Sequence, residues 1–265
     1  MIALLAVLLF MAVVMAAAWA WQKRVHDIGW VDVFWTFGTA TAALALSWTS
    51  GHGPLLRRAL VSAVVVVWAL RLGLHVAVRV AAAPQEDGRY RELRRDWGKA
   101  LQPRLFWFLQ VQAPVSTVLA LAIALGADRP APRFGWGDAL GLAVAVVAVG
   151  GEALADRQLA AFRADPANAG RICDAGLWGW SRHPNYLFEW IGWFAWPAFA
   201  IDLSGAYPQG WLALLAPALM FAVLRFGTGV PPLEAHMRRT RGEAFTAYRD
   251  RVPVFIPFPS RRSRP

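Results

Sequence analysis

Several common chemical signatures are missing from this sequence of 265 residues. A single cysteine, Cys173, excludes an internal disulfide. The histidines are scattered, and with the lone cysteine they form no cluster that has the spacing of a zinc site. No serine lies in a Gly-x-Ser-x-Gly pattern, and no glycine-rich nucleotide loop follows a strand. These absences argue against a metal centre, a serine hydrolase and a Rossmann-type nucleotide site.

Hydrophobic residues make up 57% of the chain, with 15 Trp and 15 Phe. Runs of about 20 apolar residues are long enough to cross a bilayer as helices. The first run has no Lys or Arg ahead of it, so we expect a retained span and not a signal peptide. The sequence therefore predicts an all-α membrane protein that forms a single integral membrane domain over residues 1–265. We expect seven transmembrane helices at residues 2–21, 29–50, 59–83, 105–126, 137–162, 186–203 and 210–230.

The formal net charge of +10 is distributed unevenly between alternate loops. With seven spans, one side of the membrane receives four basic residues, Arg57, Arg58, Arg129 and Arg133, and the other side receives nineteen. The positive-inside rule then places the tail in the cytoplasm and the amino terminus outside. We expect a multi-pass protein of a bacterial inner membrane. This distribution does not favour nucleic acid as a partner.

The fifth run carries charged residues on one helical face. Glu152, Asp156 and Arg163 follow each other at spacings of four and seven, and Arg157 lies one position off that face. One interpretation is a ladder of ion pairs that neutralises buried charge. The other is a cofactor-binding face, in which the carboxylates accept hydrogen bonds from ribose hydroxyls or a carboxamide and the arginine binds a phosphate.

A second polar cluster opens the sixth run. Proline suits the first position of a helix, and the free N–H groups at such an end favour anions. Asn185 and Glu189 are four residues apart and share a face. Helix-start chemistry alone does not explain the whole group, which we take as candidate cofactor-binding residues: Arg182, His183, Asn185, Tyr186 and Glu189.

The second and third runs also carry charge. Arg71, His75 and Arg79 form one stripe, in which Arg79 lies near enough to the end of the run to snorkel, and we favour a function for Arg71 and His75. Asp32 in the second run is expected to pair with Arg71 or His75, as a structural partner or in catalysis. Charged side chains at bilayer depth cost about 2.5–3.5 kcal/mol each on insertion scales, so they usually line a cavity.

The tail after the last run is basic and amphipathic. Its arginines alone would suit anionic lipid, but Arg225 inside the seventh run would not. The loop at residues 84–103 interleaves acids and bases and is expected to form a surface helix on the cytoplasmic side. The tail residues that we assign to cofactor binding are Glu234, His236, Tyr248 and Arg251, together with Arg225.

From about Gly150 to Phe258 the chain resembles the steroid 5α-reductase family, and it looks most like the bacterial DUF1295-type membrane proteins. The resemblance rests on Glu152-x3-Asp156-x6-Arg163, the Ser181-Arg182-His183-Pro184-Asn185-Tyr186 start with Glu189, Arg225, and Tyr248 before Ile256-Pro257-Phe258. The first 100 residues match more loosely, through Val31-Asp32-x2-Trp35 and Arg71-x3-His75.

The resemblance implies a reductase that binds NADPH in a cavity open to the cytoplasm. It would deliver a hydride to the C=C bond of an enone lipid such as a Δ4-3-ketosteroid, with helices of residues 1–104 on the substrate side and residues 105–265 around the cofactor. His75 aligns with the proton-donating tyrosine of the family and Asp32 with its glutamate, while Tyr90 is the reserve donor. Trp35 and Arg71 would contact the substrate.

Two alternatives remain open. Arg-His-Pro-x-Tyr, with Glu234-x-His236 in the tail, also resembles the membrane methyltransferases that act on isoprenylcysteine or phospholipid amines with S-adenosylmethionine. A lipid-binding or transport protein without catalysis is the third reading, although the chain has no repeat symmetry. The face at Glu152, Asp156 and Arg163, together with Asn185, favours the reductase.

Overall fold

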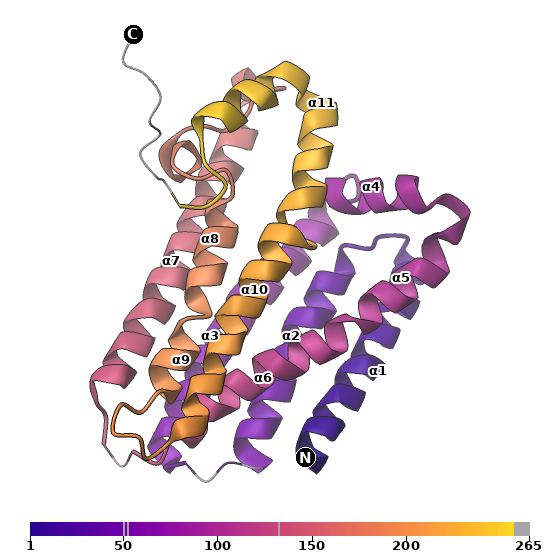
Figure 1. Ribbon diagram of the computed structural model, residues 1–265. Helices are drawn as coiled ribbons and strands as arrows, with labels where there is room; N and C mark the ends of the chain where they lie inside the picture. Colours follow the sequence, from indigo (N-terminus) through magenta and orange to yellow (C-terminus); the bar gives the residue numbers. More distant parts are fainter. Residues whose placement is uncertain (50, 52, 132, 257–265) are drawn as a thin grey trace. The chain divides into compact units, whose positions relative to one another are not determined.

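The computed structural model describes residues 1–49, 51, 53–131 and 133–256. Within this part of the chain every regular element is a helix, which confirms the all-α prediction (Figure 1). Pro257 and Phe258, which were part of the expected tail motif, lie outside the described residues, as do the last arginines of the tail.

The chain divides into two compact units. Unit 1 comprises Met1–Ala143 and Trp193–Leu219, and unit 2 comprises Val144–Gly192 and Met220–Pro265. Each unit is therefore assembled from two separate stretches of sequence. The expected division between substrate-side and cofactor-side helices after residue 104 is functional and stays a prediction.

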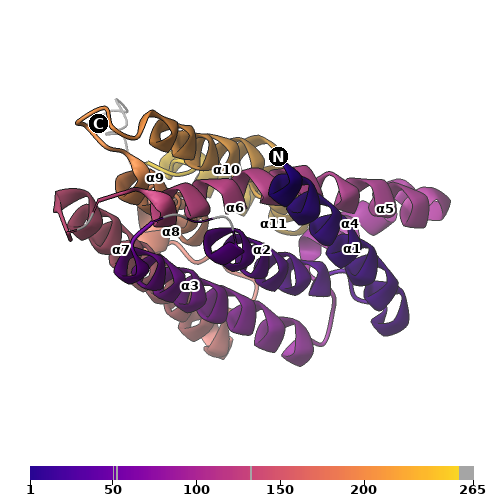
Figure 2. The ribbon, with the colours of Figure 1, turned by 90° about the horizontal axis from the view of Figure 1, so that it is seen from below.

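Unit 1 is built around α2 (Trp30–Thr49). This helix packs against α1 (Ile2–Val25), α3 (Leu55–Ala82) and α6 (Gln112–Asp128), which surround it in Figure 2. Gly73 of α3 allows one of these close contacts, because a methyl group there would overlap the Phe37 ring of α2. The shorter elements of this unit are α4 (Gly88–Trp97), the 3-10 turn η1 (Gly98–Ala100), α5 (Leu101–Gln110), α9 (Ala195–Ala200) and the 3-10 segment η4 (Pro208–Leu214).

The helix α1 of unit 1 is apolar on both faces. In α1 the buried side chains Val7, Met11, Met15 and Ala18 recur every three or four residues and form one face. The opposite face exposes further apolar side chains such as Leu9, which is 67% exposed. A helix that is hydrophobic all round is expected where the outer face meets lipid.

A buried ion cluster joins three segments of unit 1. Arg57 of α3 forms a bidentate ion pair with Asp138, and Arg129 donates to the same carboxylate over 3.0 Å. The Asp138 side chain is 1% exposed. Arg129 also donates to the carbonyl of Ile201. Two of the four arginines expected on the outer side thus have a structural role.

Unit 2 contains residues 144–164 of α7 (Trp136–Ala164), the start of which belongs to unit 1. It also contains α8 (Pro184–Gly192), residues 220–226 of α10 (Leu215–Phe226), and α11 (Val230–Arg251). Pro184 begins α8, as its position predicted. α11 bends where Gly242 adopts a positive φ of 50°, and the bend is visible in Figure 1. Two 3-10 turns, η2 (Pro166–Asn168) and η3 (Gly176–Gly179), lie between α7 and α8.

Five helical segments of the described chain are long and apolar enough to cross a membrane: Ile2–Val25, Leu55–Ala82, Gly88–Asp128, Trp136–Ala164 and Pro208–Arg251. The protein is therefore a multi-pass membrane protein by length and composition. Of the other two expected spans, one corresponds to α2, which carries Asp32. The other corresponds to α8 and α9 together, which have nine and six residues. Seven spans and the orientation of the chain stay predictions.

Candidate functional site

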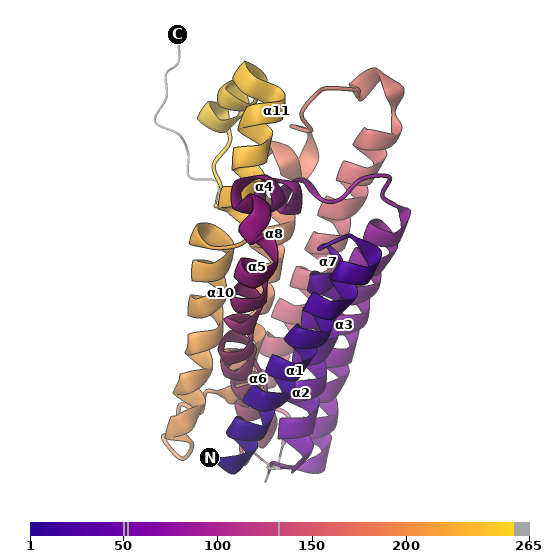
Figure 3. The same ribbon diagram turned by 90° about the vertical axis from the view of Figure 1, so that its right-hand side faces the viewer.

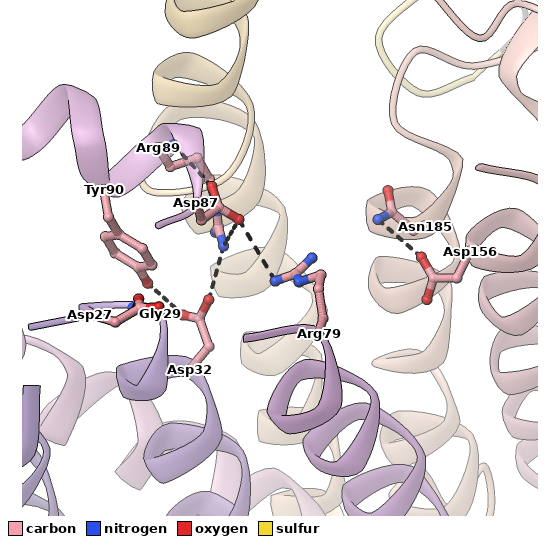
Figure 4. A network of polar contacts seen from close by, with 9 residues as sticks. All are labelled: Asp27, Gly29, Asp32, Arg79, Asp87, Arg89, Tyr90, Asp156 and Asn185. Atoms are coloured by element: carbon pink, nitrogen blue, oxygen red, sulfur yellow. Dashed lines mark hydrogen bonds and ion pairs between the residues drawn. The ribbon is translucent and has the colours of Figure 1, made fainter. Parts of the chain in front are cut away.

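A cluster of charged and aromatic side chains lies at one end of unit 1, where the α3–α4 loop meets the start of α2 (Figure 4). The Tyr90 hydroxyl donates a hydrogen bond of 2.7 Å to one carboxylate oxygen of Asp32. Arg89 forms an ion pair with the other oxygen at 2.9 Å. Tyr90 is buried, with 7% of its surface exposed. Both oxygens of Asp32 are therefore engaged by consecutive residues of α4.

Asp87 extends this network on the α3 side. Its side chain contacts Arg89 at 3.2 Å and Arg79 at 3.8 Å, and it caps the start of α4 by accepting from the Arg89 backbone N–H. Burial raises the pKa of the Asp87 carboxyl, but the charge and hydrogen bonds of Arg89, with a contribution from Arg79, outweigh it and bring the pKa to about 2. Asp87 is thus a fixed negative charge beside Arg89.

The α3–α4 loop is tied to the α1–α2 turn by a second set of contacts. Glu86 accepts from the backbone N–H of Ile28 over 2.7 Å, and it forms two hydrogen bonds of 3.0 Å with Arg94. Asp27 accepts from the Gly29 N–H at 2.7 Å and so shapes the turn. These contacts fix the position from which Tyr90 reaches Asp32.

This arrangement corrects one expectation about Asp32. We expected it to pair with Arg71 or His75 of α3, but its partners are Arg89 and Tyr90. The reason is the return of the chain after α3, which brings the start of α4 over the start of α2. Arg71 and His75 are half-buried in α3, on the stripe that ends at Arg79.

The other substrate candidate, Trp35, lies one turn after Asp32 on α2. Its ring contacts Trp68 edge to face, with centroids 6.2 Å apart. Trp68 in turn contacts Trp193 at 5.5 Å. Among the residues that the structure describes, the Trp35 indole nitrogen has no hydrogen-bond partner although it is buried.

Unit 2 brings together α7 and α8, the two helices that carry most of the expected cofactor residues. The Asn185 amide of α8 lies 3.5 Å from the Asp156 carboxylate of α7, at the outer limit of a hydrogen bond (Figure 4). Glu152 and Glu189 are buried on the same two helices, with 6% and 7% exposure. Asp156 and Asn185 are only half-buried.

Three other expected residues of unit 2 bond to one another in a cluster that we call the clasp: Arg182, His183 and Glu234. Arg182 donates to Glu234 over 2.8 Å, and His183 Nε2 lies 3.1 Å from the same oxygen. The Arg182 guanidinium also donates to the carbonyl of Val252 over 2.6 Å. Burial lowers the pKa of His183, although the hydrogen bond and charge of Glu234 act in the opposite direction. The lowered pKa favours the neutral form of the His183 ring.

Tyr248 and Arg251 of α11 also contact the segment before α8. The Tyr248 hydroxyl donates to the Trp178 carbonyl over 2.6 Å, and Arg251 pairs with Asp174 at 3.2 Å. Together with the Arg182 clasp, these bonds hold the tail on the Ser-Arg-His-Pro segment. In the structure, Arg182, Glu234 and Tyr248 thus contact other parts of the protein itself, and their role in cofactor binding stays a prediction.

The last expected cofactor residues lie nearer the surface. Arg157 is exposed and bonds to its own helix at the Ala153 carbonyl. Arg163 is exposed, whereas Arg225 and His236 are half-buried. Tyr186 stacks on His183, with ring centroids 5.6 Å apart.

Several polar side chains of unit 2 are of types that suit the functional groups of NADPH. Asp156 and Asn185 can accept and donate hydrogen bonds to ribose hydroxyls or a carboxamide, and their long mutual contact can give way to a better-placed group. The exposed Arg163 suits a phosphate. Arg182 and Glu234 fit less well, because a contact with the cofactor would break their clasp.

The residues that the sequence interpretation missed are Arg89 and Asp87. Both lie in the charged loop at residues 84–103, for which the sequence predicted a surface helix and no site residue except Tyr90. The local signal was present, because an aspartate followed by Gly88 and an arginine at the start of a charged segment is typical of a helix N-cap. What the sequence could not indicate was the distant partner, Asp32.

Comparison with family models matches residues 18–252 to the family described as a protein of unknown function, DUF1295. Neither the curated proteins nor the solved structures gave a match. The match covers the polar clusters of both units and leaves out most of α1 and the end of the tail. The chain belongs to the DUF1295 family.

Proposed function

We propose that this protein is a membrane-embedded, NADPH-dependent reductase that acts on the C=C bond of an apolar enone. The observation that carries the proposal is the Asp32–Tyr90–Arg89 cluster, a buried phenol held by a compensated carboxylate. Support for the cofactor comes from the Asp156–Asn185 pair and from the resemblance to the steroid 5α-reductase family. The sequence resemblance made Tyr90 the reserve donor, and the cluster makes it our first choice over His75.

The chemistry requires a proton donor at the substrate oxygen. Bound NADPH would supply the hydride that adds to the β-carbon of the enone. Negative charge then develops on the carbonyl oxygen, and a positioned donor stabilises it. The Tyr90 hydroxyl is the group in this cluster that can donate a neutral O–H.

Asp32 would orient that hydroxyl. In the structure the Tyr90 O–H points to Asp32, so it reaches a substrate oxygen by rotation about its own C–O bond. Arg89 balances the charge of Asp32, because an unpaired carboxylate beside the reacting oxygen would oppose the developing charge. Asp32 and Arg89 are therefore positioning residues, and Tyr90 is the proposed catalytic residue.

The test is turnover of a Δ4-3-ketosteroid or a simpler apolar enone by the purified protein with NADPH. We expect loss of NADPH absorbance together with a saturated ketone product identified by mass spectrometry. Methyl transfer from S-adenosylmethionine to a lipid acceptor, with no enone reduction, would favour the methyltransferase instead. Lipids extracted from the purified protein would narrow the class of the natural substrate.

A further inference from the structure

A shallow groove lies at the elbow where α4 passes through η1 into α5. It is lined by Trp97, Pro103, Arg104, Trp107 and Phe108. Figure 3 shows α4 turned across the end of α5, so the groove lies where the charged helix α4 joins the apolar helices α5 and α6. The Gly88–Asp128 segment contains a stretch apolar enough to cross a membrane. That stretch cannot include the charged α4, so its boundary, and with it the groove, is expected near the membrane surface.

The apolar part of the groove has two aromatic walls. Trp97 of α4 meets Phe108 of α5 edge to face, with centroids 5.8 Å apart. Trp107 is 70% exposed, although it is among the largest apolar side chains of the chain. Exposed tryptophan at the end of a span is typical of the region of lipid headgroups.

The polar part of the groove is one guanidinium. Arg104 is exposed, and among the residues that the structure describes it has neither a hydrogen-bond partner nor an ion-pair partner. It lies three residues before Trp107, so the two side chains share one face of α5. The groove thus presents a cation next to an apolar surface.

Hydrogen bonds and a ring contact join α5, which carries the groove, to α1. Gln102 of α5 accepts from Trp19 of α1 over 3.1 Å and from Gln22 over 2.9 Å. Trp19 also meets Phe106 edge to face at 5.4 Å. The Lys23 ammonium lies 4.4 Å from the Trp19 ring centroid. A second cation is therefore present on the helix that supports α5.

We propose that this groove binds an anionic phospholipid, with the phosphate of its headgroup on Arg104 and the start of an acyl chain along Trp107 and Phe108. The Arg104 guanidinium would bind the phosphate, and the aromatic side chains beside it offer an apolar surface for an acyl chain. A free phosphate would satisfy only the first of these groups. Lys23 favours a lipid with net negative charge over a zwitterionic one. The proposal does not depend on the reductase activity.

The experiment is native mass spectrometry of the full chain in detergent, titrated separately with phosphatidylglycerol, phosphatidylcholine and inorganic phosphate. We expect the wild-type protein to retain phosphatidylglycerol in preference to phosphatidylcholine. Arg104→Gln should weaken that retention about fivefold, the effect of one basic residue near a membrane surface. Trp107→Ala should weaken retention of both lipids, because it removes the apolar wall.

Arg95→Gln is the matched control, since Arg95 is an exposed arginine of α4 outside the groove lining. It should retain phosphatidylglycerol like the wild type. Melting temperatures of the lipid-free variants will show that each is folded, which we expect because both Arg104 and Trp107 are exposed. Equal retention of the two lipids by the wild type, or an unchanged Arg104→Gln, would overturn the proposal. Competition by inorganic phosphate at equal affinity would identify a free-anion site and would overturn it as well.

Discussion

The hydroxyl of Tyr90 and the carboxylate of Asp32 are 58 positions apart in the sequence and 2.7 Å apart in space. Arg89, the neighbour of Tyr90, holds the second oxygen of the same carboxylate. One short segment at the start of α4 thus supplies both a neutral donor and the charge that compensates Asp32. This relationship is the basis of the mechanism that we propose.

Replacing Tyr90 by phenylalanine should remove the proton donor and leave the shape of the site. We expect Tyr90→Phe to lower enone turnover by about 100-fold or more, the scale of a general acid. The affinity for NADPH, measured by titration, should stay near that of the wild type. His75→Phe provides the comparison, and a greater loss of turnover in that variant than in Tyr90→Phe would return the role of donor to His75.

Asp32→Asn should change the pH dependence as well as the rate, because Asp32 acts through the Tyr90 hydroxyl. An asparagine keeps the size of the side chain but removes the charge that Arg89 balances. We expect lower kcat, and a pH profile displaced from that of the wild type. A parallel fall in rate at every pH, or a loss matched by unfolding in the circular dichroism spectrum, would mark Asp32 as merely structural.

The contact between α7 and α8 depends on Gly151. A methyl group at Gly151 would overlap the Phe188 ring, whereas one at Gly150 would meet no atom within 4 Å. We expect Gly151→Ala to destabilise the protein by about 1–3 kcal/mol, as overpacking does. Gly150→Ala should be neutral or slightly stabilising, since alanine favours a helix. Thermal unfolding in detergent measures both, and equal melting temperatures of the two variants would contradict the close contact.

The Arg182–His183–Glu234 clasp should contribute measurably to the free energy of unfolding. Removing one partner of a buried ion pair leaves an uncompensated charge and costs about 3–5 kcal/mol. We therefore expect Glu234→Ala to lower the free energy of unfolding by that order. Glu243→Ala, at an exposed position of the same helix, is the control and should have little effect. A stable Glu234→Ala protein that has lost only cofactor affinity would show that Glu234 serves the cofactor and not the clasp.

Asp87 should make stability depend on pH in the acid range. Its pKa of about 2 lies below the ordinary value of 3.8, so the unfolded chain binds a proton first as the pH falls. The contribution is complete above pH 3.8 and disappears as the pH falls toward 2, and it is on the order of 2 kcal/mol. Denaturant unfolding of the wild type and Asp87→Asn at several pH values will measure it. The variant should lose less stability over this interval, and an equal loss in both proteins would contradict the assignment.

Local patterns predicted much of this structure. The apolar runs predicted the long helices, and Pro184 predicted the start of α8. The spacing of Glu152 and Asp156 predicted that both lie on one helix, which is α7. These features depend on helical periodicity and on the backbone preferences of single residues, which a sequence carries directly.

Long-range contacts were not predictable in the same way. The pairing of Asp32 with Arg89 depends on how the loop after α3 folds back, and no periodicity encodes that path. The same holds for Arg182, whose partner Glu234 is 52 positions away. The sequence marked Asp32 and Arg182 as candidate polar residues, but only the structure showed that Asp32 pairs with Arg89 and Arg182 with Glu234.

Binding of NADPH to the purified wild-type protein tests the central claim most directly. Calorimetric titration should give micromolar or tighter affinity for NADPH. The affinity should be weaker in Asn185→Ala and Arg163→Ala, with no comparable binding of S-adenosylmethionine. Binding of S-adenosylmethionine without NADPH, or of neither cofactor by a folded protein, would contradict the proposal.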